Sequence, residues 1–190
     1  MPILREILGK AMLWAFLACS LTAQNYVVGW GPFGFDTRSA SAGFVQVRAH
    51  GMVAMQRRND GAVFVSGGQA EPPPPLPAGI TFVDCDVGDN ANCYALRSDG
   101  QIAQWGKLPP FYSANKIPVP ALAPGTTYVQ VAASRSDALA LRSDGTLVVW
   151  GQNSTSYFSP PTPPAGTSFA RVAASAALML ALTLDGRVVA

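Results

Sequence analysis

The sequence predicts an all-β fold, specifically a partial β-propeller of about four blades, each an antiparallel sheet of three to four strands. Three observations predict this fold: a repeated segment with the length of a propeller blade, Asp-Gly pairs in phase with it, and a composition rich in turn formers. The 190 residues include 18 Gly and 16 Pro, 49% are hydrophobic and only 13% are charged. Such a chain can fill a core and suits many short strands joined by turns.

The Asp-Gly pairs mark the repeat. They recur at intervals of roughly 40 residues, close to the length of one propeller blade. The pairs are Asp60-Gly61, Asp99-Gly100, Asp144-Gly145 and Asp185-Gly186. Asp bonds its own backbone in tight turns, and Gly adopts the dihedral angles that such turns require. We therefore interpret the four aspartates as structural turn residues rather than as a set of catalytic carboxylates.

Tryptophan recurs in the same phase. Trp105 and Trp150 each follow the aspartate of their copy at the same distance and precede a glycine. Trp30-Gly31 repeats this motif near the start, so residues 26–31 are interpreted as the closing strand of a preceding blade. We expect the indoles of Trp105 and Trp150 to pack blade against blade, although a platform for stacking a ligand is the alternative. Trp30 is interpreted as a structural residue of the repeat.

A Pro-Ala-Gly or Ala-Pro-Gly segment precedes an aromatic residue in three copies, at 77–82, 123–128 and 164–169. A strand follows each aromatic residue, and a hairpin surrounds each Asp-Gly pair, which gives a three-stranded meander. A short strand at 117–122 is expected as a fourth member of its blade. The copies span approximately residues 24–67, 68–107, 108–152 and 153–190, together forming one incomplete propeller from residue 24 to residue 190.

These repeat residues resemble the regulator of chromosome condensation family. Leu96–Gly100 recurs as Leu141–Gly145 with the same letters, Leu-Arg-Ser-Asp-Gly, and both of these copies end on Trp-Gly. The resemblance covers about residues 25 to 190 and is closest to bacterial, secreted-type members. It implies a seven-bladed propeller, of which this chain holds about four blades, and a role in binding other proteins.

Residues 1–23 are predicted to be a signal peptide. Arg5 and Lys10 precede an uncharged run at 11–23, the layout of a secretory signal. A permanent membrane anchor, or a lipid on Cys19, are the alternatives considered; the run is shorter than a bilayer span. We expect a secreted, periplasmic or cell-surface protein that meets the membrane only through this segment.

The charge balance argues against nucleic acid as a partner. Removing residues 1–23, with Arg5, Lys10 and Glu6, leaves basic and acidic residues in nearly equal number. Nothing in the sequence forms the basic stripe that attracts phosphates or anionic lipids. We therefore expect no nucleic-acid ligand.

The segment Asp84–Asn92 is the richest polar cluster. Its side-chain oxygens could ligate Ca²⁺, but Ala95 stands where an EF-hand loop needs a glutamate, so a bulged bend is the alternative. Cys85 and Cys93 flank this bend, and export would permit a disulfide, an outcome that the sequence leaves open. His50 has no phased partner and is interpreted as a strand-end residue rather than a base.

No hydrolase, nucleotide-binding or metalloprotease motif occurs. We expect a non-catalytic scaffold without a cofactor, whose loops bind a protein that the sequence does not identify. A carbohydrate-binding or cell-surface propeller, and an exported hydrolase with a site built from loops, are the alternatives. The uncovered sheet faces at the two ends of a four-blade stack also predict self-association.

Overall fold

The computed structural model describes residues 43–68, 70–88, 91–106, 117–152, 159–176 and 178–190. The predicted signal peptide (residues 1–23), Trp30 and the strand expected at 26–31 lie outside them. Within the described residues no helix is both long enough and apolar enough to cross a bilayer.

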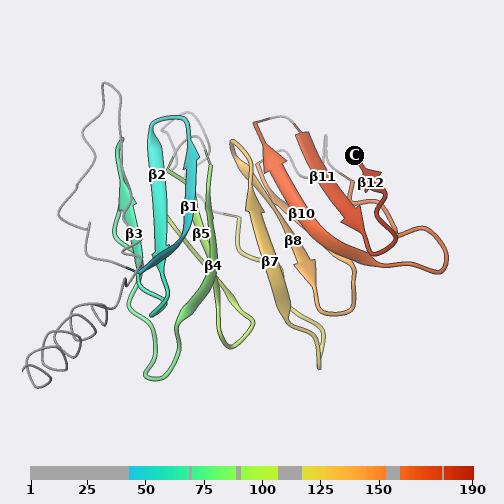
Figure 1. Ribbon diagram of the computed structural model, residues 1–190, viewed down its shortest axis with the longest axis horizontal. Helices are drawn as coiled ribbons and strands as arrows, with labels where there is room; N and C mark the ends of the chain where they lie inside the picture. Colours follow the sequence, from blue (N-terminus) through green and yellow to red (C-terminus); the bar gives the residue numbers. More distant parts are fainter. Residues whose placement is uncertain (1–42, 69, 89–90, 107–116, 153–158, 177) are drawn as a thin grey trace, which may run out of the picture.

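The described chain forms four separate three-stranded antiparallel sheets, which confirms the predicted all-β fold (Figure 1). The first sheet contains β1 (Phe44–His50), β2 (Val53–Arg58) and β3 (Val63–Ser66). The second contains β4 (Phe82–Val87), β5 (Cys93–Arg97) and β6 (Ile102–Trp105). The third contains β7 (Tyr128–Ala133), β8 (Asp137–Arg142) and β9 (Leu147–Gly151). The fourth contains β10 (Phe169–Ser175), β11 (Leu178–Thr183) and β12 (Val188–Val189).

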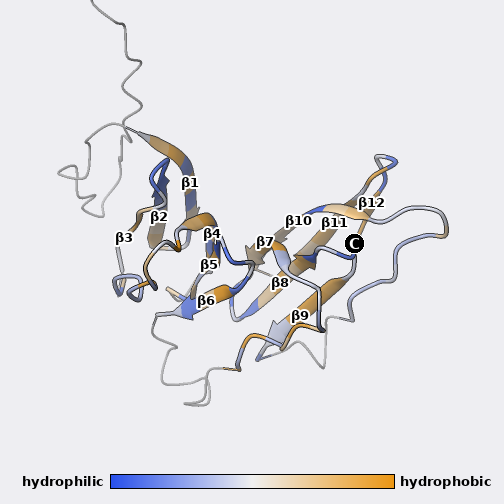
Figure 2. Cartoon of the chain, turned by 90° about the horizontal axis from the view of Figure 1, so that it is seen from below, coloured by the Kyte–Doolittle hydropathy of each residue, from blue (hydrophilic) through white to orange (hydrophobic). Residues whose placement is uncertain are grey.

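The sheets follow one another in chain order, with the first and the last at opposite ends of the row (Figures 1 and 2). We call them blades A to D in that order. Each falls within one sequence copy, and each is a simple meander whose strands pair with their neighbours in the chain. The first strands of successive blades, β1, β4, β7 and β10, contact one another and are called the inner strands.

The core consists of three blade-to-blade interfaces. Met55 and Val63 of blade A pack against Phe82 and Trp105 of blade B. The next interface joins Tyr94, Leu96 and Ile102 of blade B to Tyr128, Val131 and Trp150 of blade C. The last joins Leu139, Leu141 and Leu147 of blade C to Phe169, Val172 and Ala181 of blade D. A strand alternates its side chains between two faces, so blades B and C bury both faces and are apolar on both.

The Asp-Gly turns join each blade to the next. The carbonyls of Gly61, Gly100 and Gly145 accept hydrogen bonds from the amides of Phe82, Tyr128 and Phe169, the first residues of the following inner strands. These bonds measure 3.4, 2.9 and 3.4 Å respectively. The repeated aromatic residue is thus held by two contacts: its side chain packs in the core between blades, and its amide bonds the preceding turn.

The strand expected at 117–122 is not formed. Pro118 and Pro120 supply no amide hydrogen for a sheet ladder, so this segment runs as irregular chain. It still contributes to the core, because Val119 and Leu122 pack against the interface of blades B and C. The hydroxyl of Tyr128 also donates to the carbonyl of Pro120 at 2.6 Å.

Candidate functional site

The inner strands carry a repeated polar position two residues after the aromatic landmark. Gln46, Asp84, Gln130 and Arg171 occupy it in blades A to D. In the first three blades this side chain forms a hydrogen bond with the backbone of the next inner strand. The bonded residues are Cys85, Val131 and Val172, which occupy the same position in their repeats. These contacts join residues about one repeat apart, and we call them the inter-blade bonds.

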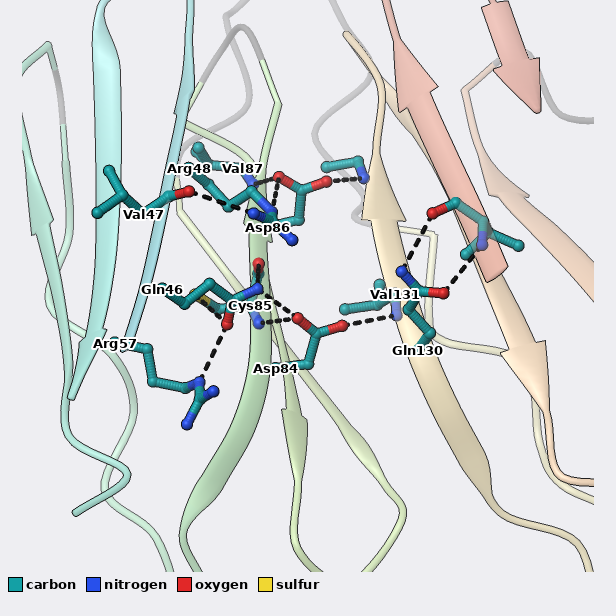
Figure 3. A network of polar contacts seen from close by, with 12 residues as sticks. Gln46, Val47, Arg48, Arg57, Asp84, Cys85, Asp86, Val87, Gln130 and Val131 are labelled. Atoms are coloured by element: carbon teal, nitrogen blue, oxygen red, sulfur yellow. Dashed lines mark hydrogen bonds and ion pairs between the residues drawn. The ribbon is translucent and has the colours of Figure 1, made fainter. Parts of the chain in front are cut away.

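Asp84 connects three blades (Figure 3). Its Oδ1 accepts a hydrogen bond from Nε2 of Gln46 in blade A at 2.5 Å, and one from the amide of Cys85 at 2.9 Å. Its Oδ2 accepts from the amide of Val131 in blade C at 3.4 Å. Arg57 holds Gln46 in place by donating to Oε1 at 3.0 Å. Both carboxylate oxygens of Asp84 are therefore engaged in holding the blades together.

Asp86 makes a second link between blades B and C. Its Oδ2 accepts from the amide of Ala133 at 2.9 Å, and its Oδ1 accepts from the amide of Val87 at 2.9 Å. Arg48 of blade A approaches Oδ1 with its Nε at 3.9 Å. Burial raises the pKa of the Asp86 carboxyl above its ordinary value, and the two amide donors and Arg48 oppose that rise.

Arg171 differs from the other three members of the polar row. Gln130 forms two bonds with the backbone of Val172 in blade D, whereas Arg171 lies on blade D itself, which no described blade follows. It is exposed, and among the described residues it has no hydrogen-bonding or ionic partner.

A β-bulge at the start of each inner strand turns one small aliphatic side chain outward. The pairing register shifts after Phe44, Phe82, Tyr128 and Phe169, so the next residue is left out of the ladder. Val45, Val83 and Val129 are consequently 53%, 44% and 45% exposed, and Ala170 holds the position in blade D. We call these four residues the bulge row.

One open hollow of about 550 Å³ is lined by three members of the bulge row, Val83, Val129 and Ala170, and by three members of the polar row, Asp84, Gln130 and Arg171. All four inner strands contribute to it, since Arg48, Asp84, Gln130 and Arg171 lie on β1, β4, β7 and β10. Val83, Val129 and Ala170 add aliphatic surface. This surface offers two arginines and half-exposed valines to a ligand, and its other polar groups are already bonded.

The disulfide that export would permit between Cys85 and Cys93 is not formed, and both thiols are buried. Cys85 faces Ala95 across the ladder, whereas Cys93 faces Val87, so the two cysteines are diagonal neighbours. Diagonal neighbours lie about 7 to 8 Å apart, with their Cβ atoms somewhat closer, while a disulfide needs a Cβ–Cβ distance of about 3.5 to 4.5 Å. Val131 and Ala138 hold the equivalent places in blade C, so the cysteines act as small apolar core residues.

The other predicted residues take structural positions. Asp60, Asp99 and Asp144 each accept a hydrogen bond from the amide two residues ahead, and Asp185 accepts from the Thr183 hydroxyl. The paired glycines Gly61, Gly100, Gly145 and Gly186 all have a positive φ. These residues lie at the turns between the second and third strands of the blades.

The indoles of Trp105 and Trp150 lie between blades. Trp105 stacks on Phe82 and donates through Nε1 to the carbonyl of Glu71 at 3.1 Å. Trp150 meets Tyr94 of the preceding blade edge to face, with ring centroids 5.6 Å apart. Both side chains are buried, so neither presents a ring to a ligand.

The polar cluster beginning at Asp84 is divided between different contacts. Asp84 and Asp86 point toward β7, while the Asn92 amide donates to the Tyr94 hydroxyl at 2.5 Å. Asp89 and Asn90 lie outside the described residues. In the described part of the chain, no three His, Cys, Asp or Glu side chains gather as a metal site would require. His50 lies at the end of β1, beside a second hollow that also contacts Asp86 and Ser175.

The inner-strand surface was missed at the sequence level, although its phase was visible. Gln46, Asp84 and Gln130 all stand two residues after the aromatic landmark, and a valine precedes each of them. Simple alternation places this valine in the core, because no local pattern marks a bulge. Aligning the copies on the aromatic residue rather than on Asp-Gly would have shown both rows.

At the sequence level, no protein-family profile and no curated protein matches the chain. Solved structures do match. Human WBSCR16 superposes with a TM-score of 0.54 at 18% identity, over 79% of this chain and 46% of its own. Prp20p from Saccharomyces cerevisiae gives 0.57 at 19% identity, over 76% and 43%. The CRINKLY ectodomain of the Arabidopsis thaliana receptor kinase ACR4 gives 0.56 at 16% identity, over 88% and 62%.

The chain thus spans less than half the length of the first two structures and 62% of the third. Identities this low establish the fold and leave function open. Together with four three-stranded sheets in chain order, these matches place the chain, at a distant level, among proteins with the fold of RCC1-type β-propellers.

Proposed function

We propose that this protein is a non-catalytic, exported scaffold that binds another protein through its inner-strand surface. The observation that carries the proposal is the bulge row, in which Val45, Val83 and Val129 are about half exposed in three successive blades. Apolar side chains gathered on a surface mark interaction sites, whereas single exposed ones need no explanation. The bulges keep these valines out of the core.

The carboxylates of the surface support a binding role over hydrolysis. A general base needs an oxygen that can reach a substrate, but both oxygens of Asp84 and of Asp86 accept backbone or side-chain hydrogen bonds within the fold. The inner-strand surface therefore offers shape, aliphatic contacts and two arginines more readily than acid–base chemistry.

One protein that shares this fold, Prp20p, is described as a binder of other proteins. The Prp20p study names binding to Gsp1p and to histones, and another structure shows Kap60 bound to yeast RCC1 (Prp20). The ACR4 match is the ectodomain of a receptor kinase. We take from these only the general use of the fold, and we infer export from the charged and apolar pattern of residues 1–23.

The test compares how strongly three forms of the chain, the wild type and two variants, bind a protein ligand. In the test form V83E/V129E, glutamates replace two members of the bulge row, and the control L184E changes an exposed leucine on a turn of blade D. We expect a ligand from the secreted fraction of the source cells to bind the wild type and the L184E form with equal affinity, and to bind the V83E/V129E form at least about tenfold more weakly. If the ligand binds all three forms with equal affinity, the inner-strand surface is not its binding site.

A further inference from the structure

We infer that the junction between blades B and C contains an internal binding site for ordered water, which joins the bend of blade B to the bend of blade C. The bend of a blade is the segment that connects its first strand to its second, β4 to β5 in blade B and β7 to β8 in blade C. The site lies in the middle of the described stack and does not rest on the proposed ligand surface.

Both bends bury a polar side chain at the same repeat position. The pairing of the first two strands makes Asn92 of blade B equivalent to Asp137 of blade C, and each is only 2% exposed. Between equivalent ladder pairs, blade B has one more residue than blade C, five (88–92) against four (134–137). Within the longer bend Ala91 has a φ of +57°, which residues with a side chain rarely adopt. A strained backbone therefore places Asn92 in the core.

Four polar atoms at this junction are buried and have no hydrogen-bond partner in the described chain. They are Oδ1 of Asn92, Oγ of Ser134, Oγ of Ser136 and Nε1 of Trp150, and their side chains are at most 2% exposed. The other such atoms among the described residues are three arginine Nε atoms beside the Asp-Gly turns. By contrast, the equivalent indole of blade B, Trp105, donates to the carbonyl of Glu71. An unpaired buried polar group destabilises a fold, so a cluster of four requires a partner.

Contacts between the two blades bring these groups to one place. The Asn92 amide bonds the hydroxyl of Tyr94, and the Tyr94 ring meets Trp150 edge to face. Gly88 joins the two bends, because its amide donates to the Asn92 carbonyl at 2.9 Å and a Cβ added to it would collide with the carbonyl of Ser134. The bends are therefore in direct contact beside the unpaired groups.

Ser136 lies beside the same indole. Its carbonyl accepts a hydrogen bond from the amide of Gln152 at 3.3 Å. The same carbonyl oxygen lies 2.5 Å from the position that a Cβ on Gly151 would take, and Gly151 directly follows Trp150. The bend and the end of the third strand of blade C thus form one wall of the site.

The chemistry of the four atoms favours water over an ion. The indole Nε1 of Trp150 only donates, so its partner must accept, and Oδ1 of Asn92 only accepts, so its partner must donate. A metal ion has no lone pair for the indole N–H, and an anion has no proton for the amide oxygen. Water does both, and it suits the Asn92 amide in either orientation. A buried water typically makes about three hydrogen bonds to groups of this kind.

The water adds a second kind of link to this junction. Asp84 and Asp86 already connect the inner strands of blades B and C by accepting from the amides of Val131 and Ala133. Water between Asn92 and the two serines connects the bends of the same blades.

The test compares the wild type with the double variant S134A/S136A and with the control S159A, which truncates an exposed serine. Oxygen-17 magnetic relaxation dispersion measures the water molecules that stay in a protein longer than its tumbling time, and serine hydroxyls do not contribute to it. Circular dichroism checks that all forms fold. Nuclear Overhauser spectroscopy between water and the Trp150 indole N–H of the wild type gives a second measurement that needs no variant.

We expect the wild type and S159A to give equal dispersion amplitudes, and S134A/S136A an amplitude lower by about one water molecule or more. We also expect a cross-peak between water and the Trp150 indole N–H. Equal amplitudes in all three forms, or no such cross-peak, would overturn the inference. A melting temperature that rises with added sodium or calcium chloride in the wild type, but not in S134A/S136A, would also overturn it, because that result indicates a bound cation.

Discussion

The side-chain amide of Gln130 on β7 makes two hydrogen bonds to the backbone of Val172 on β10, in the next blade. Its Oε1 accepts from the Val172 amide at 2.9 Å, and its Nε2 donates to the Val172 carbonyl at 3.1 Å. The Gln130 side chain thus links two neighbouring blades by hydrogen bonds, as backbone bonds link the strands within one sheet. The blades have no backbone ladder between them in the described chain, so such side chains fix how one inner strand lies along the next.

We predict that Q130A lowers the free energy of unfolding by about 1 to 3 kcal/mol, because it leaves an amide and a carbonyl of Val172 without their partners. Q101A, which truncates an exposed glutamine, serves as the control and should change stability by less than about 0.5 kcal/mol. Urea unfolding of the two variants checks this. Equal stability of Q130A and Q101A would show that the Gln130 bonds contribute nothing.

We predict that G145A is more destabilising than G186A. Both glycines follow the aspartate of a turn and have similar positive φ values, +79° and +86°, so the backbone strain of an alanine is shared. At Gly145 the added Cβ would lie 2.6 Å from Cβ of Ser168 in the next copy, whereas at Gly186 it meets nothing in the described chain. Thermal unfolding of the wild type and of each variant measures this difference. The same loss in both would mean that the third turn does not pack against blade D.

The raised pKa of Asp86 predicts how stability depends on pH. Burial raises the folded-state pKa above 3.8, so the folded state holds this proton more tightly than the unfolded state does. The stability that Asp86 contributes is therefore fully present below pH 3.8 and is lost as the pH rises through the elevated pKa. The D86N variant keeps an oxygen for the Ala133 amide and does not titrate, so it should gain stability relative to the wild type on going from about pH 3 to about pH 7.

D144N provides a comparison of opposite sign. Bonds from the Thr146 hydroxyl and amide hold the pKa of the Asp144 carboxyl below its ordinary value. The stability that Asp144 contributes is thus present above pH 3.8 and is lost as the pH falls through the lowered pKa. Urea unfolding at the two pH values measures both variants, and a D86N minus wild-type difference that stays constant with pH would contradict the account of Asp86.

We predict that Cys85 and Cys93 react slowly with thiol reagents in the native protein. Burial raises the pKa of the Cys85 thiol to about 12, so almost none is thiolate at neutral pH. In a C19S background, a colorimetric thiol assay should find both thiols in denaturant without reductant and almost none in the native state. Finding no thiol in denaturant until reductant is added would instead indicate a disulfide.

The sequence allowed the sheets and their turns to be predicted, because their signals are local and repeated. Asp144-Gly145 specifies a tight turn by backbone preference alone, and its recurrence at a constant period exposes the blade. The positions of the inner-strand surface recur in the sequence, but their exposure and their partners depend on contacts that no local pattern shows. A bulge moves Val129 out of the ladder, and Gln130 finds its partner in another sheet, a full repeat further along the chain.

The structure has neither the disulfide that the sequence left open nor the strand expected at 117–122, for reasons of register and backbone chemistry. Export and proximity in sequence made a bond between Cys85 and Cys93 conceivable, but the pairing of Cys85 with Ala95 sets the thiols diagonally. A strand at 117–122 was expected as the fourth member of its blade, yet two prolines remove its donors, and the segment supports the core through side chains instead.

The central claim is that successive repeats stack blade on blade, and the Tyr94–Trp150 contact tests it most directly. These rings belong to different copies, lie 5.6 Å apart between centroids and meet edge to face. Nuclear Overhauser spectroscopy should therefore show cross-peaks between the ring protons of Tyr94 and the indole protons of Trp150 in the folded protein. If the Trp150 indole shows cross-peaks only to residues of its own copy, blades B and C do not stack as described.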